Sequence, residues 1–469
     1  MRAASPNLIL PSLLTALLAG CQAYRAAPVD AGQVAVQRQH RTADPEAVRA
    51  VQAHIAPGSP YDAVQWDRLT LFAALLAHNP DVAAASAAVD SARAGARAAR
   101  AAPGPTLTLS SEYANDPSTS SPWLLGGGLD VPLDIGGRRT ARITSAVLGV
   151  AVARYDYADA LWAARMRARA ALNDLMSTAR EEAAGKRLLD YRLQQQAAME
   201  RRLSAGAVGR AELERIRVDA TSAAGTLQDA HARHIAARQA LAAAIGLPEV
   251  TAAGLTFLWP DYDVVPTDPG QSPLIRDRAG ATVGRADVLK AVAAYDLAES
   301  DLRGEVARQY PAITLSPGYT WERGLVKLPF NLGLALPPLD LNRRAIAAAE
   351  ARRTESGKRL ETVVANANAA LEAAINECRE ARVALDRIRT VDLPTARRLA
   401  AQADAQFRRG QIDRTDWAAA QSGVPQAEIT EITALARVHT ADAALEDAVR
   451  RPMEGPELML IPGALEPQS

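Results

Sequence analysis

The chain of 469 residues is long enough for several ordinary domains or for one elongated domain. Its 53 basic and 53 acidic side chains cancel, which argues against the strongly positive field that recruits nucleic acid. Only 4% of the residues are aromatic, and alanine is abundant beyond the first hundred residues. This composition favours long, closely packed helices over a globular aromatic core.

The N-terminus has the pattern of an export signal over residues 1–20. An apolar stretch at 8–18, too short to span a bilayer, ends in the letters LAGC at Cys21. This ending resembles a bacterial lipobox, in which signal peptidase cleaves before a cysteine that then carries lipid. An ordinary secretory signal is the alternative. We therefore expect lipidation of Cys21, a lipid-anchored segment over 21–65 and, because Gln22 rather than Asp follows, the outer membrane as destination.

The rest of the chain repeats itself. Three blocks recur in the same order: VPLDIGGRR at 131–139 and LPPLDLNRR at 336–344, PTLTLSSEY at 105–113 and PAITLSPGY at 311–319, and LSAGAVGRAEL at 203–213 and FRRGQIDRTDW at 407–417. Asp134 and Asp340 are 206 residues apart, and Gly206 and Gly410 are 204 apart. Blocks that keep their order and spacing indicate two copies of one unit of roughly 200 residues.

We place the first copy at 66–248 and the second at 284–450, joined by a connection at 249–283 and followed by a tail at 451–469. The sequence of each copy predicts a helix, two extended segments, a very long Ala-rich helix, a glycine-containing turn and a returning helix.

The long helices are nearly free of proline. None occurs from Gly137 to Leu203, and Pro394 is the single one from Leu341 to Phe407. At a rise of about 1.5 Å per residue, helices of this length span about 100 Å. We expect Pro394 to kink the second of them.

Cys378 lies in an apolar series on the second long helix whose steps alternate between four and three residues: Leu360, Val364, Ala367, Leu371, Ala374, Cys378, Ala381, Leu385 and Ile388. This spacing indicates a heptad seam in which Cys378 packs as a small side chain rather than a reactive thiol.

The extended segments are predicted at about 105–116, 123–133, 311–320 and 326–336. In the last of them, large apolar residues alternate with small or polar ones over eleven residues, so that Leu332 and Asn331 point to opposite faces. This is about the length of a tilted membrane-spanning strand. A strand of a soluble sandwich is the alternative. Two strand pairs cannot close a barrel alone, so strands that enter a membrane would require an oligomer.

Together with the Asn79-Pro80 step that ends the first helix, these features resemble the TolC-type outer-membrane factors, over about Trp66 to about Val449. The resemblance implies a mainly α protein with a membrane β-barrel portion: a homotrimer with an α-helical periplasmic tunnel and one shared barrel of twelve strands, four from each chain. The repeated PLD letters would mark the return from strand to long helix, where proline stops the ladder and Asp134 or Asp340 caps the helix.

The resemblance also implies a function, that of a passive exit duct in a tripartite efflux system. Substrate would come from a proton-driven inner-membrane pump through a periplasmic adaptor. The PLD blocks look most like the branch that serves cobalt, zinc and cadmium pumps, in which the second block usually reads PLPLFNRN; Asp340 and Arg344 depart from it. Metal cations are therefore the leading substrate class, and drug or other small-molecule efflux or type I secretion is the alternative.

The two glycine turns, at about 203–212 and 407–416, would form the tip that docks the adaptor. By position this assigns to the tip Leu203, Gly206, Glu212, Phe407, Gly410 and Arg414. Asp416 falls where family members often hold a gating acid, although Ala419 replaces a second acid one turn later. The plainer interpretation is that Gly206 and Gly410 only stop helices.

No catalytic motif is found: G-x-S-x-G, H-E-x-x-H and the P-loop are all missing from the sequence. We therefore expect no enzyme activity, no cofactor and no metal site. His231 and His234 are three residues apart without a cysteine or carboxylate cluster, which indicates a solvated helix face. The alternatives from other classes are a lipid-anchored periplasmic coiled-coil scaffold and a cell-wall enzyme, which would need an acid or histidine site.

Overall fold

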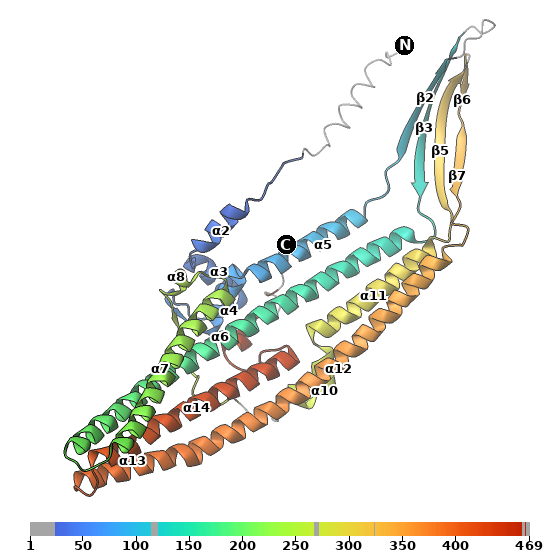
Figure 1. Ribbon diagram of the computed structural model, residues 1–469. Coiled ribbons are helices and arrows are strands. Elements are labelled where there is room, and N and C mark those ends of the chain that lie inside the picture. The colour runs from blue at the N-terminus through green and yellow to red at the C-terminus, as the bar shows by residue number, and fades with distance from the viewer. Residues whose placement is uncertain (1–23, 114–120, 267–271, 323, 462–464, 466–469) are drawn as a thin grey trace. The chain divides into compact units, whose positions relative to one another are not determined.

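The computed structural model describes residues 24–113, 121–266, 272–322, 324–461 and 465 (Figure 1). It consists of two units with a boundary between Thr42 and Ala43. The first unit contains α2, Ala31–Gln39, capped by the side chain of Asp30. The expected signal peptide and Cys21 lie outside the described residues. All further features belong to the second unit, which therefore includes residues 43–65 of the expected anchor segment.

The second unit opens with three helices and a short strand that lead into the first copy of the repeat: α3, Pro45–Ile55, β1, Gln65–Trp66, α4, Arg68–His78, and α5, Pro80–Ala99. The Asn79-Pro80 step separates α4 from α5. The Asn79 side chain accepts the backbone N–H groups of Asp81 and Val82, and Pro80 starts α5 where its missing N–H is not needed.

The two copies give the same order of elements. The first continues with β2, Thr106–Tyr113, β3, Trp123–Leu133, α6, Arg138–Ser204, and α7, Arg210–Ile245. The second contains α11, Ala286–Ala307, β5, Ala312–Glu322, β6, Leu325–Lys327, β7, Phe330–Ala335, α12, Arg343–Arg387, α13, Leu393–Arg408, and α14, Arg414–Val449. Between them lie α8, Glu249–Ala252, β4, Thr256–Phe257, α9, Pro273–Arg276, and α10, Arg278–Val283.

The strands of both copies join in one antiparallel sheet of order β2-β3-β5, with β6 and β7 on the far side of β5 (Figure 1). The expected strand at 326–336 is interrupted between β6 and β7. Pro329 lies in the gap because it has no N–H to donate to a ladder. Its carbonyl still accepts the N–H of Gly318, at 2.7 Å, so the two segments follow the same edge of β5.

The junctions from strand to long helix correct one expectation, because neither Asp134 nor Asp340 caps a helix. No side-chain cap precedes α6 or α12. Both junctions instead contain two consecutive left-handed residues, Gly136–Gly137 with φ of 77° and 81°, and Leu341–Asn342 with φ of 53° and 60°. A left-handed leucine is strained, so the second copy keeps this turn without the glycines that favour it.

The second long helix is irregular immediately before its proline. α12 passes into a π-helical turn, Ile388–Asp392, and α13 then begins with Pro394 in its first turn. A proline cannot donate the backbone hydrogen bond that a continuous α-helix requires, and π turns absorb such breaks. α14, in contrast, runs without a break through Pro425.

α6 is the central helix of this unit and packs against α5, α7, α11 and α14. The core contains buried leucines of both copies, among them Leu172 and Leu445. Cys378 belongs to it with 2% of its surface exposed, and burial raises the pKa of its thiol to about 12. The thiol therefore stays protonated and packs as an apolar group. Among the described residues, no helix has the length and hydrophobicity that crossing a bilayer requires.

Candidate functional site

One face of the sheet is apolar from edge to edge. The strand register places Leu107 opposite Leu129, and Leu315 opposite Leu332. The face consists of Leu107, Leu109, Tyr113, Trp123, Leu125, Leu129, Val131, Leu133, Ile313, Leu315, Tyr319, Trp321, Val326, Phe330, Leu332 and Leu334. Several are highly exposed, Leu109 at 75% and Leu332 at 63%. An exposed apolar surface of this extent marks contact with lipid or with another protein.

The opposite face is polar. It carries Thr106, Thr108, Ser110, Glu112, Asp130, Thr314, Ser316, Thr320, Glu322, Lys327 and Asn331. Lys327 forms an ion pair with Glu322 at one end of the sheet. Three consecutive glycines in β3 leave room for neighbouring side chains. An added Cβ on Gly126 would lie 2.5 Å from the hydroxyl oxygen of Ser110. The sheet is therefore amphipathic, as the alternation in the sequence predicts for one of its strands.

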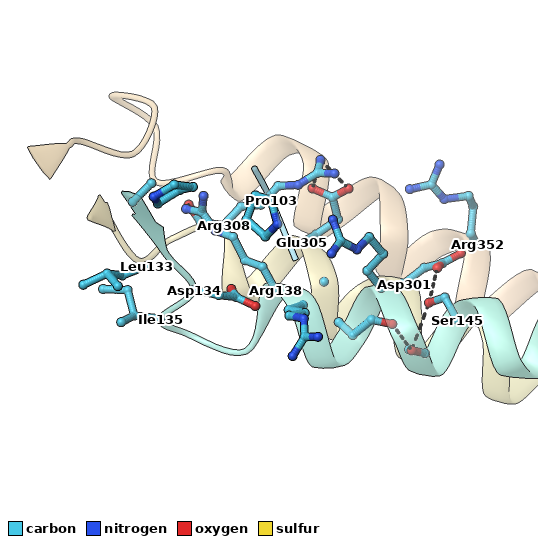
Figure 2. A pocket seen from close by; sticks show the side chains of 17 residues that line it. Pro103, Leu133, Asp134, Ile135, Arg138, Ser145, Asp301, Glu305, Arg308 and Arg352 are labelled. Carbon is cyan, nitrogen blue, oxygen red and sulfur yellow. Dashed lines mark hydrogen bonds and ion pairs between the residues drawn. The ribbon is translucent and has the colours of Figure 1, made fainter. Parts of the chain in front are cut away.

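A cavity of about 720 Å³ lies where the sheet meets the helices (Figure 2). Five arginines line it: Arg138, Arg139, Arg142, Arg308 and Arg352. Three of them bind carbonyls at or just past the C-termini of α5 and α11. Arg139 donates to Arg100 O at 2.7 Å, Arg142 to Ala101 O at 3.0 Å, and Arg138 to Ala307 O at 3.2 Å. Cations at these positions satisfy orphan carbonyls and the negative end of each helix dipole, so they fix the helices to the strand junction.

A buried network of charges joins the two copies and the C-terminal segment. Its members come from α4, α6, α14 and the residues after α14: Arg68, Arg165, Arg169, Asp442, Glu446, Glu454 and Glu457. Arg169 lies 2.5 Å from the carboxylates of both Asp442 and Glu446. Glu457 lies in a short 3₁₀ helix, Pro456–Met459, and its carboxylate is 2.8 Å from the guanidinium of Arg68.

The network holds three guanidinium groups against four carboxyls. Burial raises the pKa of Glu446, but Arg169 and Arg165 outweigh it and hold the value below the ordinary range. For Asp442 the effect of burial is larger than that of Arg169, so the pKa of this carboxyl is raised. Burial and the neighbouring Asp442 raise the pKa of Glu454 to about 7. Within one network, the pKa of Glu446 is therefore lowered, whereas the pKa values of Asp442 and Glu454 are raised.

Aromatic side chains of the connection between the copies cover this network. The guanidinium of Arg68 lies 4.9 Å from the ring centroid of Trp259. His439 stacks on Tyr262 at 4.6 Å, and its Nε2 lies 2.7 Å from the Tyr262 carbonyl oxygen. Burial lowers the pKa of His439 to about 4, so its ring is neutral. The Tyr262 hydroxyl donates to Asn173 of α6 at 2.9 Å.

The sequence analysis missed the network, although one signal was present. Arg165 and Arg169 on α6, and Asp442 and Glu446 on α14, are each four residues apart and hence on one helix face. That pattern ordinarily indicates a solvated face. Only the packing of α6 on α14 reveals that these charges are buried.

The two glycine turns have the same geometry. Gly206 and Gly410 have φ of 70° and 69°. Each glycine N–H donates to the carbonyl three residues earlier, at 2.9 and 3.0 Å, and the following N–H donates to the carbonyl five residues before it, at 2.9 Å in both turns. This pattern ends a helix in a left-handed residue, for which glycine has no steric cost.

The structure brings both turns together within one chain. Arg202, at the end of α6, forms an ion pair of 2.6 Å with Asp413, at the start of α14. Arg414 donates to Gln194 at 3.1 Å. Phe407 packs on Trp417 with ring centroids 5.6 Å apart. Leu203 is half-buried against the small cluster of Met199, Leu213 and Ile216.

The remaining expected residues at this end of the chain are exposed: Gly206, Glu212, Gly410 and Asp416. The backbone N–H of Asp416 donates to the Asp413 side chain, which caps α14, while its own carboxylate lies in solvent in the single chain. Among the described residues, no group of three His, Cys, Asp or Glu side chains could hold a metal ion. His231 lies 3.3 Å from Glu182 on an exposed face.

The family described as outer membrane efflux protein matches residues 71–247 and 280–449. No curated protein matches the chain. Three similar solved structures are the outer membrane protein VceC of Vibrio cholerae (TM-score 0.67, 82% of this chain and 97% of that one), CusC (0.65, 81% and 91%) and the open state of the MtrE outer membrane channel of Neisseria gonorrhoeae (0.63, 81% and 88%). Each is 18% identical to this chain, so these likenesses show its fold.

Proposed function

Because the chain belongs to the outer membrane efflux protein family, we propose that it is the outer-membrane exit duct of a tripartite efflux system. The observation that carries the proposal is the amphipathic sheet. Its exposed apolar face suits lipid, and its polar face of hydroxyls, amide and charges suits a water-filled lumen.

The sheet also supports assembly. Among the described residues, β2 and the β6–β7 edge each have one side without a pairing strand, and lipid does not tolerate unpaired backbone groups. If β6 and β7 count as one interrupted strand, three copies of the sheet joined edge to edge supply twelve strands for a closed barrel. We therefore propose a homotrimer. At about 1.5 Å per residue, its long helices would extend about 100 Å from the barrel as a tunnel.

The far end of the helices is the proposed docking site for a periplasmic adaptor that connects to a proton-driven inner-membrane pump. The proposed docking residues are Leu203, Gly206, Glu212, Phe407, Gly410 and Arg414. All of them except the half-buried Leu203 are exposed, and the two turns have matching geometry, so that three chains would present six similar turns. Asp416 is the proposed gate residue, and Cys21 is the proposed lipid anchor.

We retain metal cations as the leading substrate class, with drug or other small-molecule efflux or type I secretion as the alternative. This choice depends on the PLD blocks alone. A periplasmic scaffold is the rival from another class, and it would have no reason to expose one apolar face and one polar face on its strands. The two classes differ in a measurable property, because only the duct conducts ions.

Two variants on adjacent residues of β7 test the proposal. Leu332 lies on the apolar face and Asn331 on the polar face. Leu332→Arg should lose trimer in detergent extracts, since an arginine at the lipid face costs about 2–4 kcal/mol near the bilayer midplane. Asn331→Arg should form trimers that conduct in a planar bilayer. Equal assembly of both variants, or a wild-type trimer without conductance, would contradict the duct.

A further inference from the structure

We propose that Asp130 of β3 makes the lumen of the barrel selective for cations, so that the duct favours cationic over anionic solutes. This inference rests on the proposed function, because it requires the polar face of the sheet to line a pore. Asp130 is not one of the expected tip residues, and it lies just before the repeated block at 131–139.

The position of Asp130 follows from hydrogen bonds and register. Thr108 of β2 donates its hydroxyl to one carboxylate oxygen of Asp130 at 3.3 Å, and Ser316 of β5 donates to the other. Asp130 pairs with Thr106 across the β2–β3 ladder. The carboxylate therefore lies on the polar face, held between two strands by two hydroxyls, and cannot fold away toward the apolar face.

No cation neutralises Asp130 among the described residues of the strands. Its neighbours on the same face are small or uncharged, namely Thr106, Thr108, Gly128, Pro132 and Ser316. The hydroxyl contacts hold the side chain but leave its charge uncompensated. Asp130 is therefore a fixed negative charge on the surface that would line the pore.

The other charges on this face do not cancel it. Lys327 is paired with Glu322 toward the opposite end of the strands, and Glu112 adds a further negative charge there. Of the five arginines where the sheet meets the helices, Arg138, Arg139 and Arg142 direct their guanidinium groups to carbonyls at or just past the helix ends. Arg308 donates to Glu305, and Arg352 is an exposed residue of α12. Among the described strand residues, the polar face carries Glu112, Asp130 and Glu322 against Lys327, and therefore has a net negative charge.

Three copies of Asp130 would form a ring at one level of a threefold barrel. Its field extends about 8 Å at physiological ionic strength and about 3 Å at 1 M salt. Such a ring raises the local concentration of cations in low salt and loses its effect in high salt. The selectivity of the pore should therefore depend on both Asp130 and ionic strength.

The experiment is the reversal potential of purified trimers in planar bilayers under a KCl gradient centred near 0.1 M. Asp130→Asn keeps the size of the side chain and can still hydrogen-bond both hydroxyls, once as acceptor and once as donor. It should lower the potassium-to-chloride permeability ratio by about twofold or more. Asp130→Ser, a second neutral variant, should do the same. Asp130→Glu and Thr108→Val keep the charge and should retain the ratio of the wild type.

An unchanged permeability ratio in a conducting neutral variant would overturn the inference and leave the duct intact. A ratio that falls equally in Thr108→Val and Asp130→Asn would also overturn it, because the effect would then follow local structure rather than charge. Absence of conductance in the wild-type trimer would instead contradict the proposed function itself.

Discussion

Replacing Arg169 by methionine should destabilise the helical part of the protein severely. The side chain is buried and lies 2.5 Å from both Asp442 and Glu446, which are 4% and 0% exposed. Methionine keeps most of the aliphatic volume but removes the guanidinium that pairs with Asp442, while Glu446 retains Arg165 at 2.8 Å. Breaking a buried pair on one side costs about 3–5 kcal/mol, because it leaves the partner charged and unpaired in the interior.

A matched control exists on the same two helices. Arg187 of α6 forms an ion pair of 2.6 Å with Glu428 of α14, but its side chain is 54% exposed. An exposed pair contributes about 0–1 kcal/mol, so Arg187→Met should change stability little. Adding Asp442→Leu to Arg169→Met should recover part of the loss, since it removes the buried carboxylate that has lost its ion pair with Arg169, whereas Glu446 keeps its ion pair with Arg165.

The assay is denaturant unfolding of purified protein in detergent, followed by helical circular dichroism and by the fluorescence of tryptophan. Trp259 is a suitable reporter because it lies over the network. A loss for Arg169→Met no greater than that for Arg187→Met would refute the reasoning, because it would mean that the buried charges do not depend on one another.

Three further predictions concern other parts of the molecule. Burial raises the pKa of Glu454 to about 7 from its usual 4.5, so the wild type should lose stability as pH rises through this window. Glu454→Gln should remove that loss, so its melting temperature should exceed that of the wild type by more at pH 8 than at pH 5. An equal difference at the two pH values would contradict the assignment. Cys21→Ser should abolish labelling by a radioactive fatty acid, and label retained by the variant would exclude lipidation at this residue. Gly410→Trp should leave the trimer intact but abolish adaptor crosslinking and efflux, whereas Gly410→Asn, which tolerates positive φ, should preserve them. Wild-type efflux in the tryptophan variant would show that the turn does not dock the adaptor.

Local patterns in the sequence were sufficient for the order of elements. The duplicated blocks and the proline-free stretches predict two copies of strands and long helices, and the family match confirms the TolC-type assignment. The alternation around Leu332 and Asn331 predicts opposite faces because side chains in a strand have a period of two, and the register places them so.

Features that depend on distant partners could not be read in this way. Arg68 and Glu457 are 389 residues apart, and no local periodicity connects them. The segment after α14 has no helical or strand periodicity that would predict a core contact, yet Glu457 is buried. The prediction that Asp134 and Asp340 cap the long helices was wrong, because a pair of left-handed residues separates each aspartate from its helix. The substrate, the adaptor and the gate involve molecules that one chain does not contain.

The π-helical turn at Ile388–Asp392 fixes the angular position of everything beyond it. A π turn accommodates one extra residue in an α-helix, and each residue corresponds to about 100° of rotation but only about 1.5 Å of length. Deleting one residue here would leave the reach of the helix almost unchanged while turning Phe407 and Gly410 about its axis by about a quarter of a circle. The orientation of the turn between α13 and α14 is thus set some twenty residues upstream of Gly410. An insertion at the π turn would rotate this turn about the helix axis without shortening the helix.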